Sequence, residues 1–299
     1  MNAPPANNAR GILLMVLAIF LFAVLLAVTK HLSQDYSVWQ LLWARFAFDA
    51  LFIVCIFHRR VPTLLRPRAP ALQWWRSFLM ATAAVPYFYA LKFLPLADVS
   101  AVLFLTPIMV TALSGPMLGE RVRRRRWMGV VLGFTGALIV IRPAAEVAQW
   151  AVILPLLSAV ARAFYQLSTR QLSGRDHPYT STLYEPLVGV LVFTGVLPFV
   201  WTTPDATGWA LMILLGVAGA VGHYVLLKAM EVAAASVIAP FNYLGLLWAT
   251  LFGYVLFGDL PDIWTGVGAA VIVGSGFYIF YHERGQRSPA PRAGRRPAD

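Results

Sequence analysis

Long apolar stretches without a charged residue are the feature that most restricts how this chain folds. A helix needs roughly 20 apolar residues to cross a bilayer, because each residue advances it by only about 1.5 Å. Six stretches of this kind contain no Lys, Arg, Asp or Glu: 11–29, 99–119, 186–204, 206–227, 232–258 and 263–281. Each of them is therefore predicted to be a transmembrane helix.

Four further stretches complete the set of predicted spans. Three shorter apolar runs become long enough if a charged residue at one end extends its side chain to the membrane surface: 77–91, 127–141 and 147–161. The fourth, 38–57, is apolar apart from Arg45 and Asp49. The sequence thus predicts an all-α integral membrane protein with ten transmembrane helices, and it lacks the alternating pattern of an outer-membrane barrel.

The composition excludes several other classes of protein. Of the 299 residues, 59% are hydrophobic and 12% are charged, whereas soluble domains carry about 25% charged residues. A water-soluble enzyme is thereby excluded, and the single cysteine, Cys55, excludes a disulfide-based scaffold. The net charge of +11 raises the question of nucleic-acid binding, which the placement of the charges answers.

Basic residues cluster on one side of the predicted membrane. With the N-terminus inside, 19 of the 24 Lys and Arg residues fall on the cytoplasmic side, as the positive-inside rule requires. We interpret the basic run at 121–126 as a topology signal that faces anionic membrane lipids, and we expect no nucleic-acid partner. The sequence therefore predicts that both termini lie inside (N-in/C-in), with a disordered basic cytoplasmic tail over 283–299.

The two halves of the chain resemble each other at a shift of about 140 residues. Three pairs of segments recur in the same order: Thr29-Lys30-His31-Leu32-Ser33 with Thr169-Arg170-Gln171-Leu172-Ser173, Gly119-Glu120 with Gly258-Asp259, and Trp127-x-Gly129 with Trp264-x-Gly266. A repeat of five helices crosses the membrane an odd number of times, so its two copies have opposite orientations, as in many secondary transporters. We predict two inverted five-helix repeats, at 10–142 and 148–282.

In these features the chain resembles the drug/metabolite transporter superfamily, in particular its EamA-type members. Two matching stretches carry the resemblance. The first is residues 94–101, which lead into a proline-bearing helix that closes with Gly119-Glu120-Arg121; the second is residues 233–240, in a segment that closes with Gly258-Asp259. The resemblance implies an inner-membrane carrier with a central cavity and no cofactor. Relatives that the chain resembles export amino acids, aromatic compounds or amino-acid-derived metallophores, or carry S-adenosylmethionine or riboflavin.

Four charged side chains lie within the predicted spans, where each costs at least about 2.5–3.5 kcal/mol unless it faces the protein interior. Arg162 and Glu185 fall near mid-membrane, where they either pair with each other or bind substrate. The Arg162 guanidinium is the strongest candidate for binding a carboxylate or phosphate. Arg45 and Asp49 share one helix face and either form an internal salt bridge or take part in substrate or proton binding. Glu185, which aligns with Arg45 in the repeat, is a candidate for proton coupling.

Other residues are predicted to line the substrate site or to pack the helix bundle. His223 is either a hydrogen-bonded core histidine or a switch. Pro107 and Pro240 free backbone carbonyls, which suits helices that line a binding site or are simply kinked. The candidate contacts are Tyr87, Thr106, Tyr165, Gln166, His223, Asn242, Tyr243 and Trp248. Glycines along 129–136 and 266–276 predict close helix packing, within the chain or in a homodimer.

The sequence contains no motif for ATP hydrolysis, metal binding or a catalytic nucleophile, so we predict a protein that is not an enzyme and holds no metal. We predict a secondary transporter of a small polar or amphipathic metabolite with a carboxylate or phosphate. Export of amino acids or amino-acid-derived metabolites is favoured, and uptake of a vitamin or nucleoside-like compound is the alternative. A lipid scramblase or membrane enzyme is the alternative from another class. The substrate, the direction of transport, proton coupling and the oligomeric state stay open.

Overall fold

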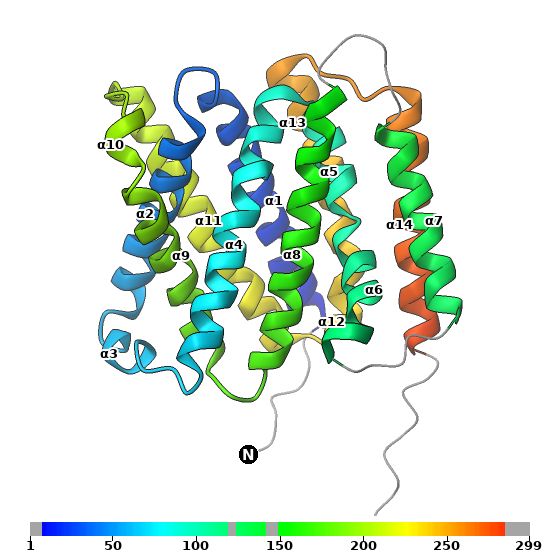
Figure 1. Ribbon diagram of the computed structural model, residues 1–299, viewed down its shortest axis with the longest axis horizontal. Helices are drawn as coiled ribbons and strands as arrows, with labels where there is room; N and C mark the ends of the chain where they lie inside the picture. The colour runs from blue at the N-terminus through cyan, green and yellow to red at the C-terminus, as the bar shows by residue number, and fades with distance from the viewer. Residues whose placement is uncertain (1–7, 119–123, 142–148, 285–299) are drawn as a thin grey trace, which may run out of the picture.

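The structure, a computed structural model, describes residues 8–118, 124–141 and 149–284, and its elements in these ranges are helical (Figure 1). The longer helices are α1 (Asn8–Leu32), α2 (Val38–Phe57), α4 (Pro70–Phe93), α7 (Arg124–Ile141), α8 (Ile153–Leu172), α9 (Pro178–Thr194), α11 (Ala206–Val232) and α14 (Ile263–Arg284). The shorter segments are α3 (Val61–Leu64), α5 (Leu96–Leu103), α6 (Thr106–Leu118), η1 (Gln149–Val152), α10 (Leu197–Val200), α12 (Ala235–Ile238), η2 (Ala239–Tyr243) and α13 (Leu244–Phe257). The predictions for residues 119–123 and for the tail beyond Arg284 lie outside the described residues.

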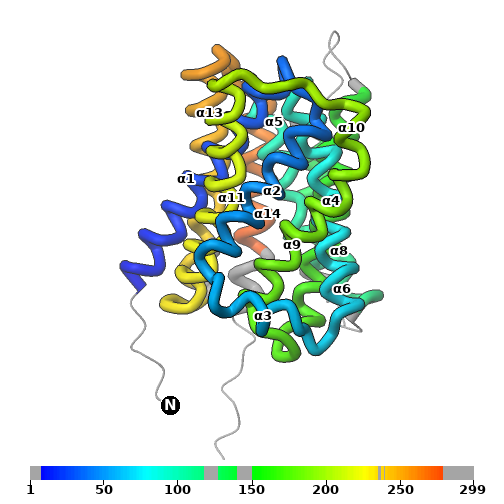
Figure 2. The backbone as a smooth tube through the Cα atoms, turned by 90° about the vertical axis from the view of Figure 1, so that its left-hand side faces the viewer, coloured from blue at the N-terminus to red at the C-terminus, as the bar shows by residue number. Residues whose placement is uncertain are grey.

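Within the described ranges, six helical segments are long and apolar enough to cross a membrane: Asn8–Leu32, Val38–Phe57, Leu96–Met117, Trp150–Leu172, Ala206–Val232 and Pro240–Phe257. Shorter apolar helices lie at Trp127–Ile139 and Ile263–Tyr278. When α5 and α6 are counted as one span, and α12 to α13 as another, successive spans run in alternate directions, and α1 begins and α14 ends at the same, lower end of the bundle (Figure 1). Both views show α3 at that end and α10 at the other (Figures 1 and 2).

Two of the predicted spans are broken, at corresponding places in the two halves. The predicted helix at 99–119 is interrupted at Phe104 and Leu105, between α5 and α6, just before Pro107. In the second half, α12 gives way to the 3-10 segment η2, which contains Pro240, before α13 begins. A proline removes a backbone hydrogen bond and crowds the preceding turn, which explains both interruptions. The span predicted at 186–204 also differs, because α9 covers Pro178–Thr194 and only the short α10 follows it.

The helices of the two halves pack across each other in matching pairs. α1 packs against α11 as α8 packs against α4, and α2 packs against α11 as α9 packs against α4. α2 also packs against α9, and α7 against α14. The list of pairs stays the same when each helix is replaced by its counterpart in the other half. The counterparts are α1 and α8, α2 and α9, α4 and α11, and α7 and α14. Figure 2 shows α1 and α11 side by side.

Glycines allow the closest of these approaches. A Cβ at Gly136 on α7 would lie 2.8 Å from the carbonyl oxygen of Gly268 and 2.9 Å from the backbone nitrogen of Ile272, both on α14. At Gly216 on α11, a Cβ would lie 3.0 Å from backbone atoms of α2. The glycine-rich faces of α7 and α14 therefore pack together within one chain, and their use in a homodimer stays a prediction.

Candidate functional site

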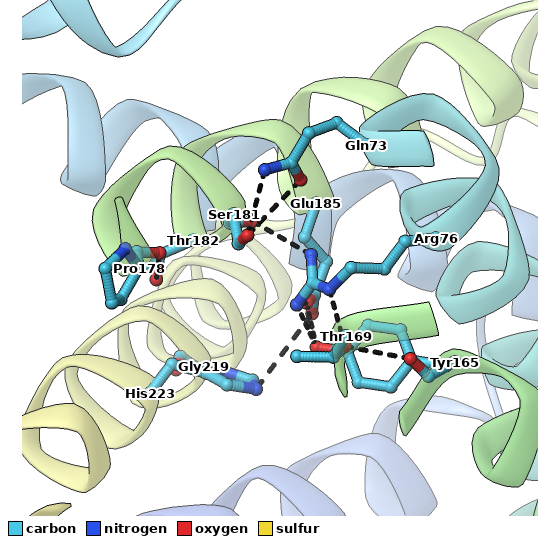
Figure 3. A network of polar contacts seen from close by, with 10 residues as sticks. All are labelled: Gln73, Arg76, Tyr165, Thr169, Pro178, Ser181, Thr182, Glu185, Gly219 and His223. Carbon is cyan, nitrogen blue, oxygen red and sulfur yellow. Dashed lines mark hydrogen bonds and ion pairs between the residues drawn. The ribbon is translucent and has the colours of Figure 1, made fainter. Parts of the chain in front are cut away.

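A buried ion pair between α4 and α9 is the centre of a polar network in the protein interior (Figure 3). Arg76 Nη2 lies 3.3 Å from Glu185 Oε2, and both residues are 4% exposed. The hydroxyl of Tyr165 on α8 donates a 2.7 Å hydrogen bond to the same carboxylate oxygen and accepts a hydrogen bond from Arg76. One carboxylate thus connects three helices.

Arg76 also uses its remaining donors to hold α4 against α8 and α9. Its Nε donates to Thr169 Oγ1 at 2.7 Å, and its Nη1 donates to the carbonyl oxygen of Ser181 at 3.2 Å. Gln73, one turn earlier on α4, donates to Ser181 Oγ at 3.0 Å and to Asp176 Oδ2 at 3.1 Å. The guanidinium presents its donors in a fixed fork, which suits a site with acceptors on two neighbouring helices.

Of the two alternatives for Arg162 and Glu185, the ion pair between them is not formed, because Arg76 occupies that place. α4 packs against both α8 and α9, so its guanidinium reaches Glu185 from between them. The Arg162 guanidinium instead lies over the ring of Tyr87, with its central carbon 4.9 Å from the ring centre. The charge count placed Arg76 on the cytoplasmic side, yet α4 begins at Pro70, which puts Arg76 roughly 9 Å along the helix.

His223 joins the network from α11 (Figure 3). Its Nδ1 donates to the carbonyl oxygen of Gly219 at 2.9 Å, while its Nε2 lies 4.0 Å from Glu185 Oε1. Its ring also packs edge-on against Phe22, with the ring centres 4.9 Å apart. The hydrogen bond fits the expectation of a core histidine, and the ring at the same time faces the carboxylate that Arg76 binds.

Arg45 and Asp49 on α2 form a second polar group, and they do not pair with each other. They are 4% and 2% exposed. Arg45 Nε and Asp49 Oδ1 have no hydrogen-bond partner among the residues that the structure describes. The Arg45 guanidinium lies over the ring of Phe46, with its central carbon 4.5 Å from the ring centre. The internal salt bridge that the four-residue spacing suggested is therefore not formed, and a part in substrate or proton binding stays a prediction.

Arg162 on α8 is the third unsatisfied charge. Its Nε is buried and has no hydrogen-bond partner in the described ranges. Arg45, Asp49, Arg76, Arg162 and Glu185 are hereafter called the interior charge cluster. Three arginines and two carboxylates give it one excess positive charge.

Of the other predicted contacts, two present polar atoms without partners. The hydroxyl of Thr106, at the break before α6, and the indole nitrogen of Trp248 on α13 are buried and accept or donate no hydrogen bond within the described residues. The Trp248 ring packs edge-on against Phe20 on α1, with the ring centres 5.0 Å apart. Like the charges of the cluster, these two groups come from different halves of the chain.

The structure does not bring the last three predicted residues to the interior charge cluster. Tyr243 in η2 packs its ring between Phe104 and Phe277, with ring centres 5.2 and 4.9 Å away. Gln166 and Asn242 are exposed. Among the described residues, no group of three or more His, Cys, Asp or Glu side chains is placed to hold a metal ion. The arrangement is suited to binding anionic and cationic groups of a small molecule between the helices.

Comparison with known proteins identifies the kind of molecule that carries this site. The model of the EamA-like transporter family matches the chain twice, at residues 9–142 and 149–281. The chain belongs to the EamA-like transporter family. It is a multi-pass membrane transporter rather than an enzyme, and the family resemblance inferred from the sequence is confirmed.

Several proteins similar to this EamA-like transporter carry different substrates. A pseudopaline exporter of Pseudomonas aeruginosa is 32% identical over 269 residues, covering 88% of this chain and 93% of that protein. A riboflavin transporter of Rhizobium johnstonii is 31% identical, covering 96% of each chain. An S-adenosylmethionine uptake transporter of Rickettsia prowazekii is 23% identical, covering 95% and 97%. A crystal structure with 19% identity superposes with a TM-score of 0.66, covers 94% of this chain and 99% of that one, and supports the fold alone.

Proposed function

We propose that this EamA-like protein is a secondary transporter of the inner membrane that works by alternating access between two inverted five-helix repeats. Three observations support the proposal. Successive spans run in alternate directions, the helix pairs keep their pattern when the halves are exchanged, and Lys and Arg are concentrated in alternate loops of the chain. In this arrangement the ten spans place both termini in the cytoplasm, and the interior charge cluster lies between the repeats.

The transported molecule in this proposal is a small polar or amphipathic metabolite with a carboxylate or phosphate. The observation that carries it is the buried Nε of Arg162, which has no hydrogen-bond partner among the described residues, within a cluster that has one excess positive formal charge. A guanidinium binds a carboxylate or phosphate through two parallel hydrogen bonds, and the Tyr87 ring supports it from one face. Export of amino acids or amino-acid-derived metabolites is the preferred direction and class, in line with the similarity to the pseudopaline exporter.

Uptake of a vitamin or nucleoside-like compound is the second candidate function. Its support is the riboflavin transporter, which is 31% identical and matches this chain over 96% of both lengths. Proton coupling is compatible with either direction of transport. Glu185 is the candidate carrier of the proton, since it accepts from Tyr165 and lies near His223.

Untargeted metabolomics of medium and cells, from a deletion strain and an overexpressing strain, tests the proposed function. Export predicts that the substrate accumulates in the medium on overexpression and in the cells on deletion, whereas uptake predicts the reverse. If no metabolite changes in either strain, the proposed transport function is contradicted. The same measurement reports the substrate and the direction together.

The role of Arg162 is tested with the substrate found in this way. Arg162→Ala should abolish transport into or out of reconstituted vesicles while the protein still inserts into the membrane, because the substrate's anionic group loses its partner. The matched control is Arg175→Ala, at an exposed arginine in the turn after α8, which should transport like the wild-type protein. Wild-type rates for Arg162→Ala would refute its role in binding.

A further inference from the structure

An arginine and an aspartate one turn apart on α2 stay unpaired in the protein interior. Arg45 Nε and Asp49 Oδ1 are buried and lack hydrogen-bond partners among the described residues. Opposite charges four residues apart on a helix usually meet. Because an unpaired charge is costly to remove from water, buried charges are normally paired or hydrogen-bonded. Two neighbouring buried groups of opposite formal charge, each with one atom that lacks a hydrogen-bond partner among the described residues, therefore indicate a place where a ligand supplies the missing partners.

The helix that packs beside them presents bare backbone at this point. A Cβ at Gly219 on α11 would lie 3.6 Å from Asp49 Oδ2 and 3.9 Å from Arg45 Nε, so both charged groups approach the same position. The Cδ1 atom of Leu25 on α1 lies nearest to it, at 3.3 Å, so an apolar side chain borders this position. One turn earlier, a Cβ at Gly216 would lie 3.0 Å from the Arg45 carbonyl oxygen and the Asp49 backbone nitrogen. Close packing at Gly216 thus fixes this part of α2, while Gly219 adds no side chain that covers the two charges.

The orientation of each side chain matches one half of a zwitterion. The central carbon of the Arg45 guanidinium lies 4.5 Å from the centre of the Phe46 ring, and its buried Nε has no acceptor among the described residues, so the group has a donor available for a carboxylate. An ionised Asp49 only accepts hydrogen bonds, so it suits a cationic donor such as an ammonium group. The two residues together are neutral, as is a zwitterion.

We propose that Arg45 and Asp49 form a zwitterion subsite that binds the α-amino-acid head group of the transported metabolite. Arg45 donates to the carboxylate of the head group, and Asp49 accepts from its ammonium, which is attached to the same carbon atom. Arg162 is then available for a second anionic or polar group of the substrate. The inference rests on the proposed transport function and narrows its substrate class to α-amino acids and compounds that carry this head group.

Thermal unfolding of the purified full-length protein in detergent, at graded concentrations of defined probes, tests the subsite. Free L-phenylalanine, L-histidine, L-glutamate and S-adenosylmethionine carry the head group, and riboflavin does not. Each amino acid that raises the melting temperature is measured again in its N-acetyl form and its C-terminal amide form. Both blocked forms should bind at least about tenfold more weakly, because each removes a charge-assisted hydrogen bond.

Two size-matched substitutions separate a binding role from a structural one. In Asp49→Asn, the N-acetyl form should bind as well as the free amino acid, while the amide form stays weak. In Arg45→Gln, the amide form should match the free amino acid, while the N-acetyl form stays weak. A purely structural role would weaken all three ligands alike. If a variant fails to fold, the comparison of free and blocked ligands on the wild-type protein still decides.

Several results would overturn the zwitterion subsite. The first is equal binding of the free and blocked forms to the wild-type protein. The second is an equal loss of binding for all three ligand forms in both variants, and the third is an unchanged melting temperature with all four head-group compounds. Failure of the proposed transport function is a separate result, because it appears as unchanged metabolite levels in the deletion and overexpressing strains. If those strains reveal a substrate without the head group, the transport function stands and the subsite falls.

Discussion

Loss of Arg76 should destabilise the fold strongly, because it leaves Glu185 buried without its cation. Arg76→Met removes the 3.3 Å ion pair and the hydrogen bonds that hold α4 against α8 and α9. Removing one partner of a buried ion pair costs about 3–5 kcal/mol, and with side chains 5% and 6% exposed, little solvent reaches this pair. Tyr165 still donates to Glu185, and His223 lies 4.0 Å from its other oxygen. We therefore expect a loss of about 3–4 kcal/mol, in the lower part of the range.

Unfolding in mixed micelles of increasing SDS content measures this loss as a change in the free energy of unfolding. The double variant Arg76→Met/Glu185→Gln should recover more than half of it, because no buried charge is then left unpaired. Arg175→Met, at an exposed arginine, is the control and should stay within about 0.5 kcal/mol of the wild-type protein. The reasoning is refuted if Arg76→Met loses less than about 1 kcal/mol, or if the double variant is as unstable as the sum of the single ones.

Two further predictions concern the packing and the orientation of the bundle. Gly136→Ala should lower the free energy of unfolding by about 1–3 kcal/mol, because its methyl group would meet backbone atoms of α14. The control Gly266→Ala, in open space on α14, should be no less stable than the wild-type protein in the same assay, and equal stability of the two variants would contradict the α7–α14 packing. In a Cys55→Ser background, Gln34→Cys should react with a membrane-impermeant maleimide on intact cells, whereas Arg175→Cys should react only after the membrane is opened; the reverse pattern would invert the proposed topology.

Much of the fold follows from the apolar pattern, because bilayer thickness sets a length that a sequence either meets or does not. The span predicted at 38–57 has the same first and last residues as α2. The sequence also indicated where regular helix would fail, since Pro107 and Pro240 lie at the two breaks. It placed one helix wrongly, at 186–204. The charge-free run begins after Glu185, but α9 begins at Pro178 and carries Glu185 and Pro186 in its interior.

The site was harder to predict, because charges near a span end have two physical solutions. A long basic side chain can extend to the membrane surface, or it can turn inward to a buried partner. Counting charges cannot distinguish these two solutions, and for Arg76 it favoured the wrong one. One signal was available: Gln73, Arg76 and Ser77 put three polar residues close together near the start of an otherwise apolar stretch. The unpaired state of Arg45 and Asp49 left no such signal, since it depends on how α11 packs beside α2.

The two halves of the chain use their equivalent buried charges differently. Glu185 and Arg45 occupy equivalent positions in the two halves of the sequence, yet their surroundings differ. Glu185 Oε2 binds both Arg76 and Tyr165, whereas Arg45 has a buried nitrogen without a partner among the described residues. A transporter needs satisfied groups where helices must stay packed and unsatisfied groups where the substrate supplies the partner. In the proposed mechanism, one half therefore uses its buried charge to hold α4, α8 and α9 together, and the other half keeps its charge available to the substrate.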